Sequence, residues 1–138
     1  MTEQLKTIKA IHLALCLGVT ASYVFLGDLT SIKNLQINLS NTSTLTYLLI
    51  PIGAYFISNF LYKGQLSKVD KKLSLEEKFP FYQTASIVRW GILEGSAFII
   101  LFLNPDLVFF GLLIIIYLFL IYPTQDRMKR DFEAFQKV

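Results

Sequence analysis

The sequence predicts an all-α protein that crosses a membrane four times, with the helices in an antiparallel bundle and both termini in the cytoplasm. Two observations carry this prediction. Hydrophobic residues make up 54% of the 138 residues and charged residues only 17%, whereas charged residues make up about 25% of an ordinary soluble domain. The apolar residues also lie in four long runs, with most basic residues in alternate connections. A chain of this length is expected to form a single domain, residues 1–138.

Each apolar run is close to the roughly 20 residues that a helix needs to cross a bilayer. The runs cover about residues 10–27, 45–62, 82–103 and 107–122. Lys6 and Lys9 precede the first run as in a signal peptide, but the run continues through Phe25 and Leu26, so we interpret it as an uncleaved helix. Residues 104–106 read Asn-Pro-Asp, a tight turn that makes the third and fourth runs an antiparallel hairpin.

The basic residues predict the orientation of these runs. On one side lie Lys6, Lys9, Lys63, Lys68, Lys71, Lys72, Lys78, Arg127, Lys129, Arg130 and Lys137. Lys33 lies on the other side, and Arg89 lies within the third run. Because loops rich in Lys and Arg stay in the cytoplasm, we expect both termini and the middle connection there. The net charge of +3 is thereby explained without nucleic acid as a partner.

The ends of the runs carry two further signals. Ser74 and Glu77 match a capping box, in which each side chain accepts a hydrogen bond from the backbone amide of the other residue. A helix is therefore predicted to begin in the connection before the third run. Tyr62, Tyr82 and Tyr122 lie where the runs should meet the membrane surface, so we interpret them as interfacial anchors.

The C-terminal tail, residues 124–138, has the pattern of an amphipathic helix. Met128, Phe132 and Phe135 occur at positions i, i+4 and i+7 among charged residues, which gives one apolar stripe. Such a helix lies on the membrane surface or on a partner. The pattern equally allows a short helix that folds back onto its own bundle.

Motifs of soluble enzymes are missing from the sequence, including phosphate-binding loops, dinucleotide fingerprints and nucleophile elbows. We therefore predict no catalytic residue, no cofactor and no metal site, and favour a non-catalytic protein. A membrane enzyme would have to rely on Glu94, Arg89 and His12. His12 and Cys16 share a helix face at i and i+4, but two ligands without a third are weak evidence for a metal.

Glu94 and Arg89 are the charged residues of the third run. Counted from Tyr82 at about 1.5 Å per residue, Arg89 lies ~10 Å deep and Glu94 ~18 Å deep, near the middle of a layer ~30 Å thick. A lone carboxylate there costs several kcal/mol, so Glu94 is expected to be protonated or paired. The two residues are about 140° apart around the helix. We therefore expect no salt bridge between them, and expect Arg89 to extend toward the membrane surface.

The partner of Glu94 is expected on another helix or another subunit. Candidates on the neighbouring runs are Thr20, Ser22, Tyr23, Ser58 and Asn59. Two roles follow for Glu94. It is either a carboxylate that binds a proton or cation, or a protonated side chain that holds helices together by hydrogen bonds.

Small residues form stripes on two of the predicted helices. Gly91 and Gly95 make a G-x-x-x-G pattern beside Glu94, and Ala14, Gly18 and Ser22 recur every four residues on the first run. Such stripes allow two helix backbones to approach closely. Either the first and third helices pack on each other within one chain, or one stripe is a subunit interface.

Residues 82–85 (Tyr-Gln-Thr-Ala), 89–90 (Arg-Trp) and 93–95 (Leu-Glu-Gly), with Pro123-Thr124 after the last run, resemble a motif in small bacterial four-helix integral membrane proteins of unassigned function. The resemblance implies a multi-pass protein of the bacterial inner membrane. A fainter similarity, carried by Glu94-Gly95 and the small-residue stripes, is to the proteolipid (c-type) subunits of rotary ATPases. That similarity implies that Glu94 is an ion-binding carboxylate.

Two functions are therefore expected. The first is a non-catalytic subunit or oligomerising component of a larger membrane assembly, whose partners are the lipid bilayer and copies of itself or other membrane proteins. The alternative is a membrane protein that translocates protons or cations with Glu94, with Arg89 adjusting the electrostatics of that carboxylate.

Overall fold

The computed structural model describes residues 1–27, 42–103 and 107–136, without the side chains of residues 42–44. The elements are α1 (Thr2–Leu26), α2 (Thr42–Tyr47), α3 (Leu49–Ser67), α4 (Leu75–Leu103), α5 (Val108–Leu120) and α6 (Gln125–Phe135). These ranges contain no strand, so the predicted all-α class is confirmed for the part of the chain described. Lys33, Lys137 and the predicted turn at residues 104–106 lie outside the described residues.

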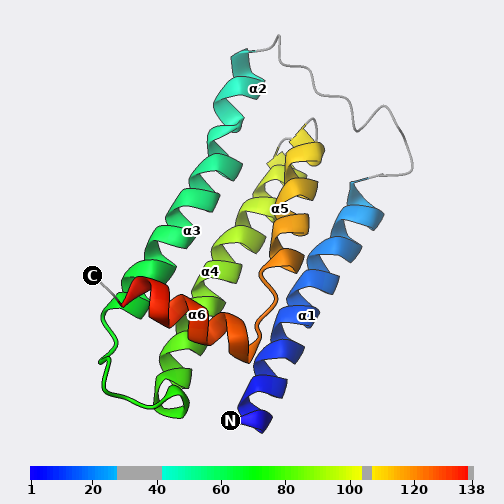
Figure 1. Ribbon diagram of the computed structural model, residues 1–138. Helices are drawn as coiled ribbons and strands as arrows, with labels where there is room; N and C mark the ends of the chain where they lie inside the picture. Colours follow the sequence, from blue (N-terminus) through cyan, green and yellow to red (C-terminus); the bar gives the residue numbers. More distant parts are fainter. Residues whose placement is uncertain (28–41, 104–106, 137–138) are drawn as a thin grey trace.

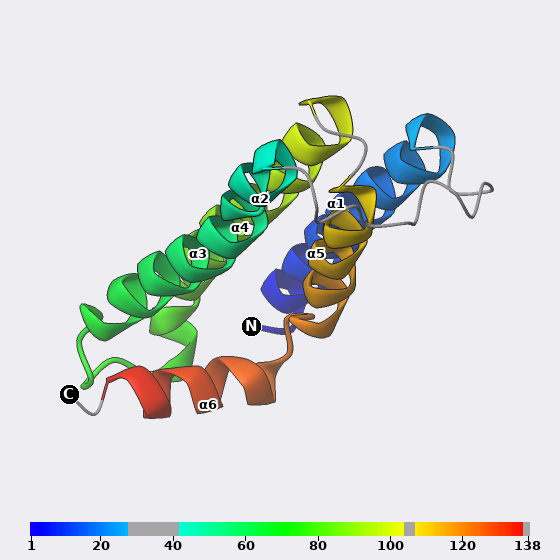
Figure 2. The ribbon, with the colours of Figure 1, turned by 90° about the horizontal axis from the view of Figure 1, so that it is seen from above.

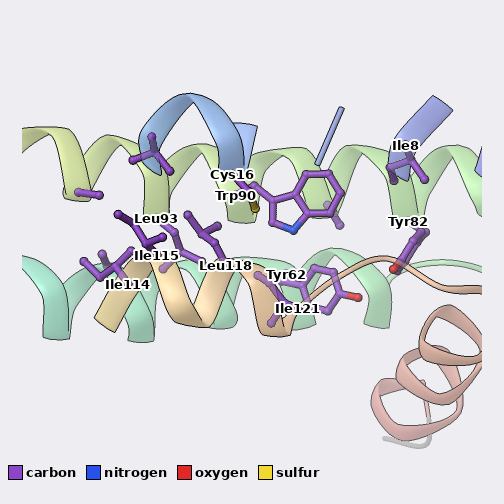
Figure 3. Packing of buried hydrophobic residues seen from close by; sticks show 14 of the residues in the cluster. Ile8, Cys16, Tyr62, Tyr82, Trp90, Leu93, Ile114, Ile115, Leu118 and Ile121 are labelled. Atoms are coloured by element: carbon purple, nitrogen blue, oxygen red, sulfur yellow. The ribbon is translucent and has the colours of Figure 1, made fainter. Parts of the chain in front are cut away.

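Helix α4 is the centre of the bundle. It packs against α1, α3 and α5, and Figures 1 and 2 show α3 on one side of it and α1 on the other. Helices α4 and α5 run in opposite directions, as expected for a hairpin (Figure 1). Figure 3 shows Leu93 of α4 beside Ile114 and Ile115 of α5 in the buried core.

Three helices are long and apolar enough to cross a membrane. They are Thr2–Leu26, Leu45–Ser67 (the end of α2 continued by α3) and Leu75–Leu103. Helix α5 coincides with the fourth predicted run but has 13 residues, a length of about 20 Å against the ~30 Å of a hydrocarbon layer. The chain then bends by 99° into α6. The fourth span therefore remains a prediction.

The helices extend beyond the apolar runs wherever polar residues continue the helical backbone. Helix α1 begins at Thr2, well before the first run, and α4 begins at Leu75. The start of α4 is fixed by the predicted capping box. Ser74 N donates to Glu77 Oε2 at 2.7 Å, and Glu77 N donates to Ser74 Oγ at 3.2 Å.

One end of the bundle, here called the basic end, comprises the start of α1, the end of α3, the connection from α3 to α4, the start of α4 and α6 (Figure 1). The Met1 ammonium and Glu76 Oε1 form an ion pair of 3.2 Å that joins the starts of α1 and α4. The described members of the predicted cytoplasmic set are carried by these segments: Lys6, Lys9, Lys63, Lys68, Lys71, Lys72, Lys78, Arg127, Lys129 and Arg130. The residues that predict the orientation are thus gathered at one end of the fold.

Helix α6 begins immediately after the sharp bend that follows α5. Thr124 caps it, because its Oγ1 accepts a hydrogen bond of 3.1 Å from the backbone amide of Arg127. The Arg127 guanidinium reaches back and donates to the carbonyl oxygens of Leu120, at 2.9 Å, and Tyr122, at 3.1 Å. The carbonyl group of Leu120, the last residue of α5, thereby gains a cationic partner, which stabilises a helix C-terminus.

The apolar stripe of α6 packs on the bundle of its own chain. Met128 and Phe132 are buried, and the Phe132 and Phe135 rings lie 6.5 Å from Tyr82 and 6.2 Å from Tyr62, respectively. Figure 2 shows α6 lying across the ends of α3 and α4. The predicted amphipathic helix is therefore present, and of the two arrangements that the pattern allows, the chain adopts the folded-back one.

Candidate functional site

In the part of the chain that the structure describes, Arg89 of α4 is the most deeply buried of the Lys, Arg, Asp and Glu side chains. It is only 9% exposed and is directed toward α3 and α5. Its Nη2 donates to Tyr117 Oη at 2.6 Å, and Tyr117 Oη donates in turn to Asn59 Oδ1 at 3.1 Å. The guanidinium carbon also lies 4.5 Å from the centre of the Tyr62 ring, a cation–π contact. Arg89 Nε is buried without a hydrogen-bond partner among the described residues.

The expectation that Arg89 extends toward the membrane surface stays a prediction; its guanidinium lies against Tyr62, near the end of α3, but within the bundle, where Arg89 is 9% exposed. The side chain stays in the interior because two neighbouring helices supply what a buried guanidinium needs: a hydroxyl acceptor from Tyr117 and an aromatic face from Tyr62. Interactions of this kind partly offset the cost of removing the cation from water. Burial of Arg89 therefore follows from the pairing of helices rather than from the sequence of α4.

Tyr62 extends this cluster to α6. Its hydroxyl donates to Asp131 Oδ2 at 2.6 Å. Tyr62 and Tyr82 are 3% and 1% exposed, so their interpretation as interfacial anchors is wrong, whereas Tyr122 is 38% exposed. Both tyrosines are covered because α6 folds back over them. The resulting polar cluster is Asn59, Tyr62, Arg89, Tyr117 and Asp131.

The polar cluster connects four helices, α3, α4, α5 and α6, through hydrogen bonds and one cation–π contact. Sequence reasoning identified Arg89 but assigned no such role to Tyr117 or Asp131. Hydrogen bonds that join residues 28, 58 and 69 positions apart have no local signature in a single sequence. The cluster fixes the relative positions of the helices at the basic end.

An apolar groove of about 320 Å³ lies between α3, α4 and α5. Pro51, Tyr55 and Phe56 form its α3 side, and Leu93 of α4 lines it one turn away from Arg89. Tyr117 closes the end of the groove nearest the polar cluster. Its lining is apolar apart from the tyrosines, which suits contact with hydrocarbon better than with polar groups.

Glu94 lies on a different side of α4 from Arg89. It is partly buried, and its carboxylate interacts electrostatically with Cys16 of α1. Glu94 forms no hydrogen bond or ion pair within the described part of the chain. The five side chains expected as partners donate their hydrogen bonds to backbone oxygens instead. Thr20 donates to Cys16, Ser22 to Gly18, Tyr23 to Ala97, and Ser58 and Asn59 both to Tyr55. The two possibilities predicted for Glu94, a partner in another subunit and protonation, are both compatible with its contacts in the described residues.

His12 and Cys16 are brought together as their spacing predicts. Cys16 Sγ lies 3.7 Å from His12 Nε2, and both side chains are buried. His12 Nε2 donates to the Leu118 carbonyl oxygen at 2.8 Å, and its ring lies edge-on to Trp90 at 4.7 Å. His12 therefore joins α1 to α4 and α5. Groups of three or more potential His, Cys, Asp or Glu metal ligands do not occur among the described residues.

The small-residue stripes do not pack on other helices of this chain. Among the described residues, no atom of another helix lies within 4 Å of the position that a Cβ atom would take at Gly18, Gly91 or Gly95. Ala14 is exposed and Ser22 is partly exposed. Helices α1 and α4 do contact each other, but through larger residues, as in the hydrogen bond of 2.5 Å from Tyr23 Oη to the Ala97 oxygen. Of the two alternatives for the stripes, the subunit interface remains a prediction.

Comparison with known proteins gives no assignment: no protein-family model matches the chain, and neither a curated protein nor a solved structure matches it.

Proposed function

We propose that the protein is a non-catalytic membrane protein that acts as a subunit or oligomerising component of a larger assembly. The observation that carries the proposal is the open space at Gly18, Gly91 and Gly95. A glycine on a helix surface offers almost no side chain for lipid to cover, but it allows a second helix to approach closely. Ile87 and Phe102, which are 38% and 63% exposed, provide larger side chains on α4 above and below these glycines.

The proposed location is the inner membrane, with the basic end in the cytoplasm. The three candidate spans and the gathering of basic residues at one end support this orientation. We propose that α5 provides the fourth span despite its short helix. Labelling of a single cysteine in intact cells tests the orientation. With Cys16 replaced by serine, Lys72→Cys should react with a membrane-impermeant thiol reagent only after the cells are lysed, and labelling in intact cells would contradict it.

Gentle extraction from the native membrane is the first test of the proposed function. We expect the extracted particle to have a mass that is a multiple of 15.8 kDa, or to contain other membrane proteins in fixed proportion. Mass spectrometry of the intact particle distinguishes a homo-oligomer from a mixed complex. A particle containing a single copy and no other protein would contradict the proposal.

Cysteine cross-linking tests a homo-oligomer more precisely. Cys16 is the chain's single cysteine, so a Cys16→Ser background provides a cysteine-free starting point. In this background, Gly91→Cys and Gly95→Cys should form disulfide-linked dimers in native membranes under mild oxidation. Leu113→Cys and Ile116→Cys are matched controls, since these α5 residues are 46% and 55% exposed. Equal cross-linking at all four positions would indicate random collision and would contradict a specific α4 interface.

A second candidate function, translocation of protons or cations, is favoured by the isolation of Glu94. The carboxylate lies on α4 immediately before Gly95, and its chain supplies no hydrogen bond to it in the described residues. An assembly that covers Gly95 would also enclose Glu94. Glu94→Gln should then preserve the assembly but abolish ion flux in reconstituted vesicles. If Glu94 only holds helices together, Glu94→Gln should behave like the wild type and Glu94→Leu should lower the stability of the protein. A fully active Glu94→Leu protein would contradict both roles.

A further inference from the structure

A cavity of about 580 Å³ lies at the basic end, between α6 and the start of α4. Lys129 and Phe132, three residues apart on α6, contribute one wall. The opposite wall comes from the connection between α3 and α4 and from the first turn of α4, with Lys71, Leu75 and Lys78. Its volume is within the range of small-ligand sites, roughly 300–1,000 Å³. The cavity exists because α6 folds back across the ends of α3 and α4 (Figure 2).

The lining of the cavity combines positive charge with an apolar floor. Three lysines face it against one carboxylate, that of Glu133. Lys78 is held in place, because its Nζ donates to Gln136 Oε1 at 3.1 Å and lies 5.4 Å from the Phe132 ring centre. Lys71 and Lys129 form no ion pair in the described part of the chain. Two ammonium groups are therefore available to an anion.

We propose that this cavity binds the phosphate-bearing headgroup of an anionic membrane lipid. The ammonium groups of Lys71 and Lys129 match the phosphate, and the partly exposed apolar side chain of Leu75 matches the glycerol and first acyl carbons. The 99° bend between α5 and α6 places α6 across the helix ends, at the level of lipid headgroups when the bundle spans a bilayer. Basic pockets at the ends of membrane helices favour such headgroups. The inference requires a membrane-spanning bundle but not an oligomer.

Lipid binding to the full-length chain tests this proposal. Native mass spectrometry of detergent-solubilised protein would compare phosphatidylglycerol with phosphatidylcholine as the added lipid. We expect phosphatidylglycerol to bind more tightly, and Lys71→Gln or Lys129→Gln to weaken it about five-fold each, the equivalent of ~1 kcal/mol per lysine. Glu133→Gln should strengthen binding, since it removes the negative charge from the lining.

Lys72→Gln is the matched control. Lys72 is adjacent to Lys71 and exposed, and the substitution changes the net charge equally, but Lys72 does not line the cavity. We expect it to leave lipid binding unchanged. Equal weakening by Lys72→Gln and Lys71→Gln would overturn the proposal in favour of diffuse surface charge. Binding of inorganic phosphate to lipid-free protein, with the same dependence on Lys129, would overturn the lipid assignment in favour of a soluble phosphate.

Discussion

Helices α4 and α5 pack together, and each carries a glycine: Gly91 on α4 faces open space, whereas Gly111 on α5 lies in a tight contact with α1. At Gly111 a Cβ atom would overlap the Tyr23 hydroxyl of α1, whereas at Gly91 it would meet open space. Gly111 therefore allows a contact that the chain makes with itself. Gly91 allows a close approach that the chain does not use.

The same contrast applies to the charged residues of α4. Arg89 is enclosed by Tyr62 and Tyr117 from two other helices, whereas Glu94 has no hydrogen-bond partner in the described residues. Polar groups within a membrane are stable when they are paired. On the side of α4 that faces α3 and α5, the chain itself supplies partners to the Arg89 guanidinium, except at Nε. The side that carries Gly91, Glu94 and Gly95 has room for another chain.

The largest expected effect is on the side of α4 that faces α3 and α5, at Tyr117. Tyr117→Phe removes the acceptor of the buried Arg89 guanidinium and the donor to Asn59, so we expect a loss of about 3 kcal/mol in the free energy of unfolding. Unfolding in mixed detergent micelles measures it. Tyr55→Phe is the control, because Tyr55 lines the same groove but its hydroxyl forms no hydrogen bond within the described chain. Equal losses for both variants would show that the polar cluster does not stabilise the fold.

A smaller loss is expected at Gly111. Gly111→Ala would force the Tyr23 ring to move and break its hydrogen bond to Ala97, and overpacking of this kind costs about 2 kcal/mol. In a Tyr23→Phe background the loss should be smaller, because the hydrogen bond to Ala97 is already absent, although the overlap with the ring carbons remains. Gly53→Ala, at a position with open space, should show no loss. Thermal unfolding measures the stability of Gly111→Ala, Tyr23→Phe, the double variant and Gly53→Ala. Equal melting temperatures of Gly111→Ala and Gly53→Ala would refute the tight contact.

The next effect concerns the docking of α6. Tyr62→Phe removes the hydrogen bond to Asp131, which we expect to cost about 1.5 kcal/mol because the acceptor is charged. Hydrogen exchange should accelerate in residues 125–136 and remain unchanged in α1. Asp126→Asn, on the exposed part of α6, serves as the control. If both variants leave α6 equally protected, apolar packing alone holds this helix in place.

The smallest effect, with the opposite sign, is expected on the open side. Gly18→Ala and Gly91→Ala should stabilise the isolated chain by about 0.5 to 1 kcal/mol, because alanine is the better helix former and meets no atom there. In the native membrane the Gly91→Ala change should instead weaken assembly if the stripe is an interface. Unfolding of the monomer and the mass of the extracted particle measure the two effects separately. Loss of stability in the monomer would mean that the open space is filled within the chain.

Local patterns were sufficient to predict where the apolar helices lie along the chain and where α4 begins, but not where α1 begins or that α2 and α3 are separate helices. The apolar runs, the capping box of Ser74 and Glu77, the stripe of α6 and the pairing of His12 with Cys16 all depend on spacings of three or four residues along one helix. Helical geometry alone fixes which of these residues meet. The site was predicted less well, since Arg89 and Glu94 were identified but the partners of Arg89 were not.

What the sequence determined by itself is therefore the set of helices, their apolar character and the gathering of basic residues at alternate connections, because hydrophobicity and the helical repeat are local properties. Only the tertiary structure decided which side of each helix faces inward. That choice depends on the rotation of α4 and α5 against their neighbours, which is fixed by contacts between residues far apart in the chain, such as Tyr62 with Asp131. Glycine consequently allows a close contact with Tyr23 at position 111, whereas at position 91 it faces open space.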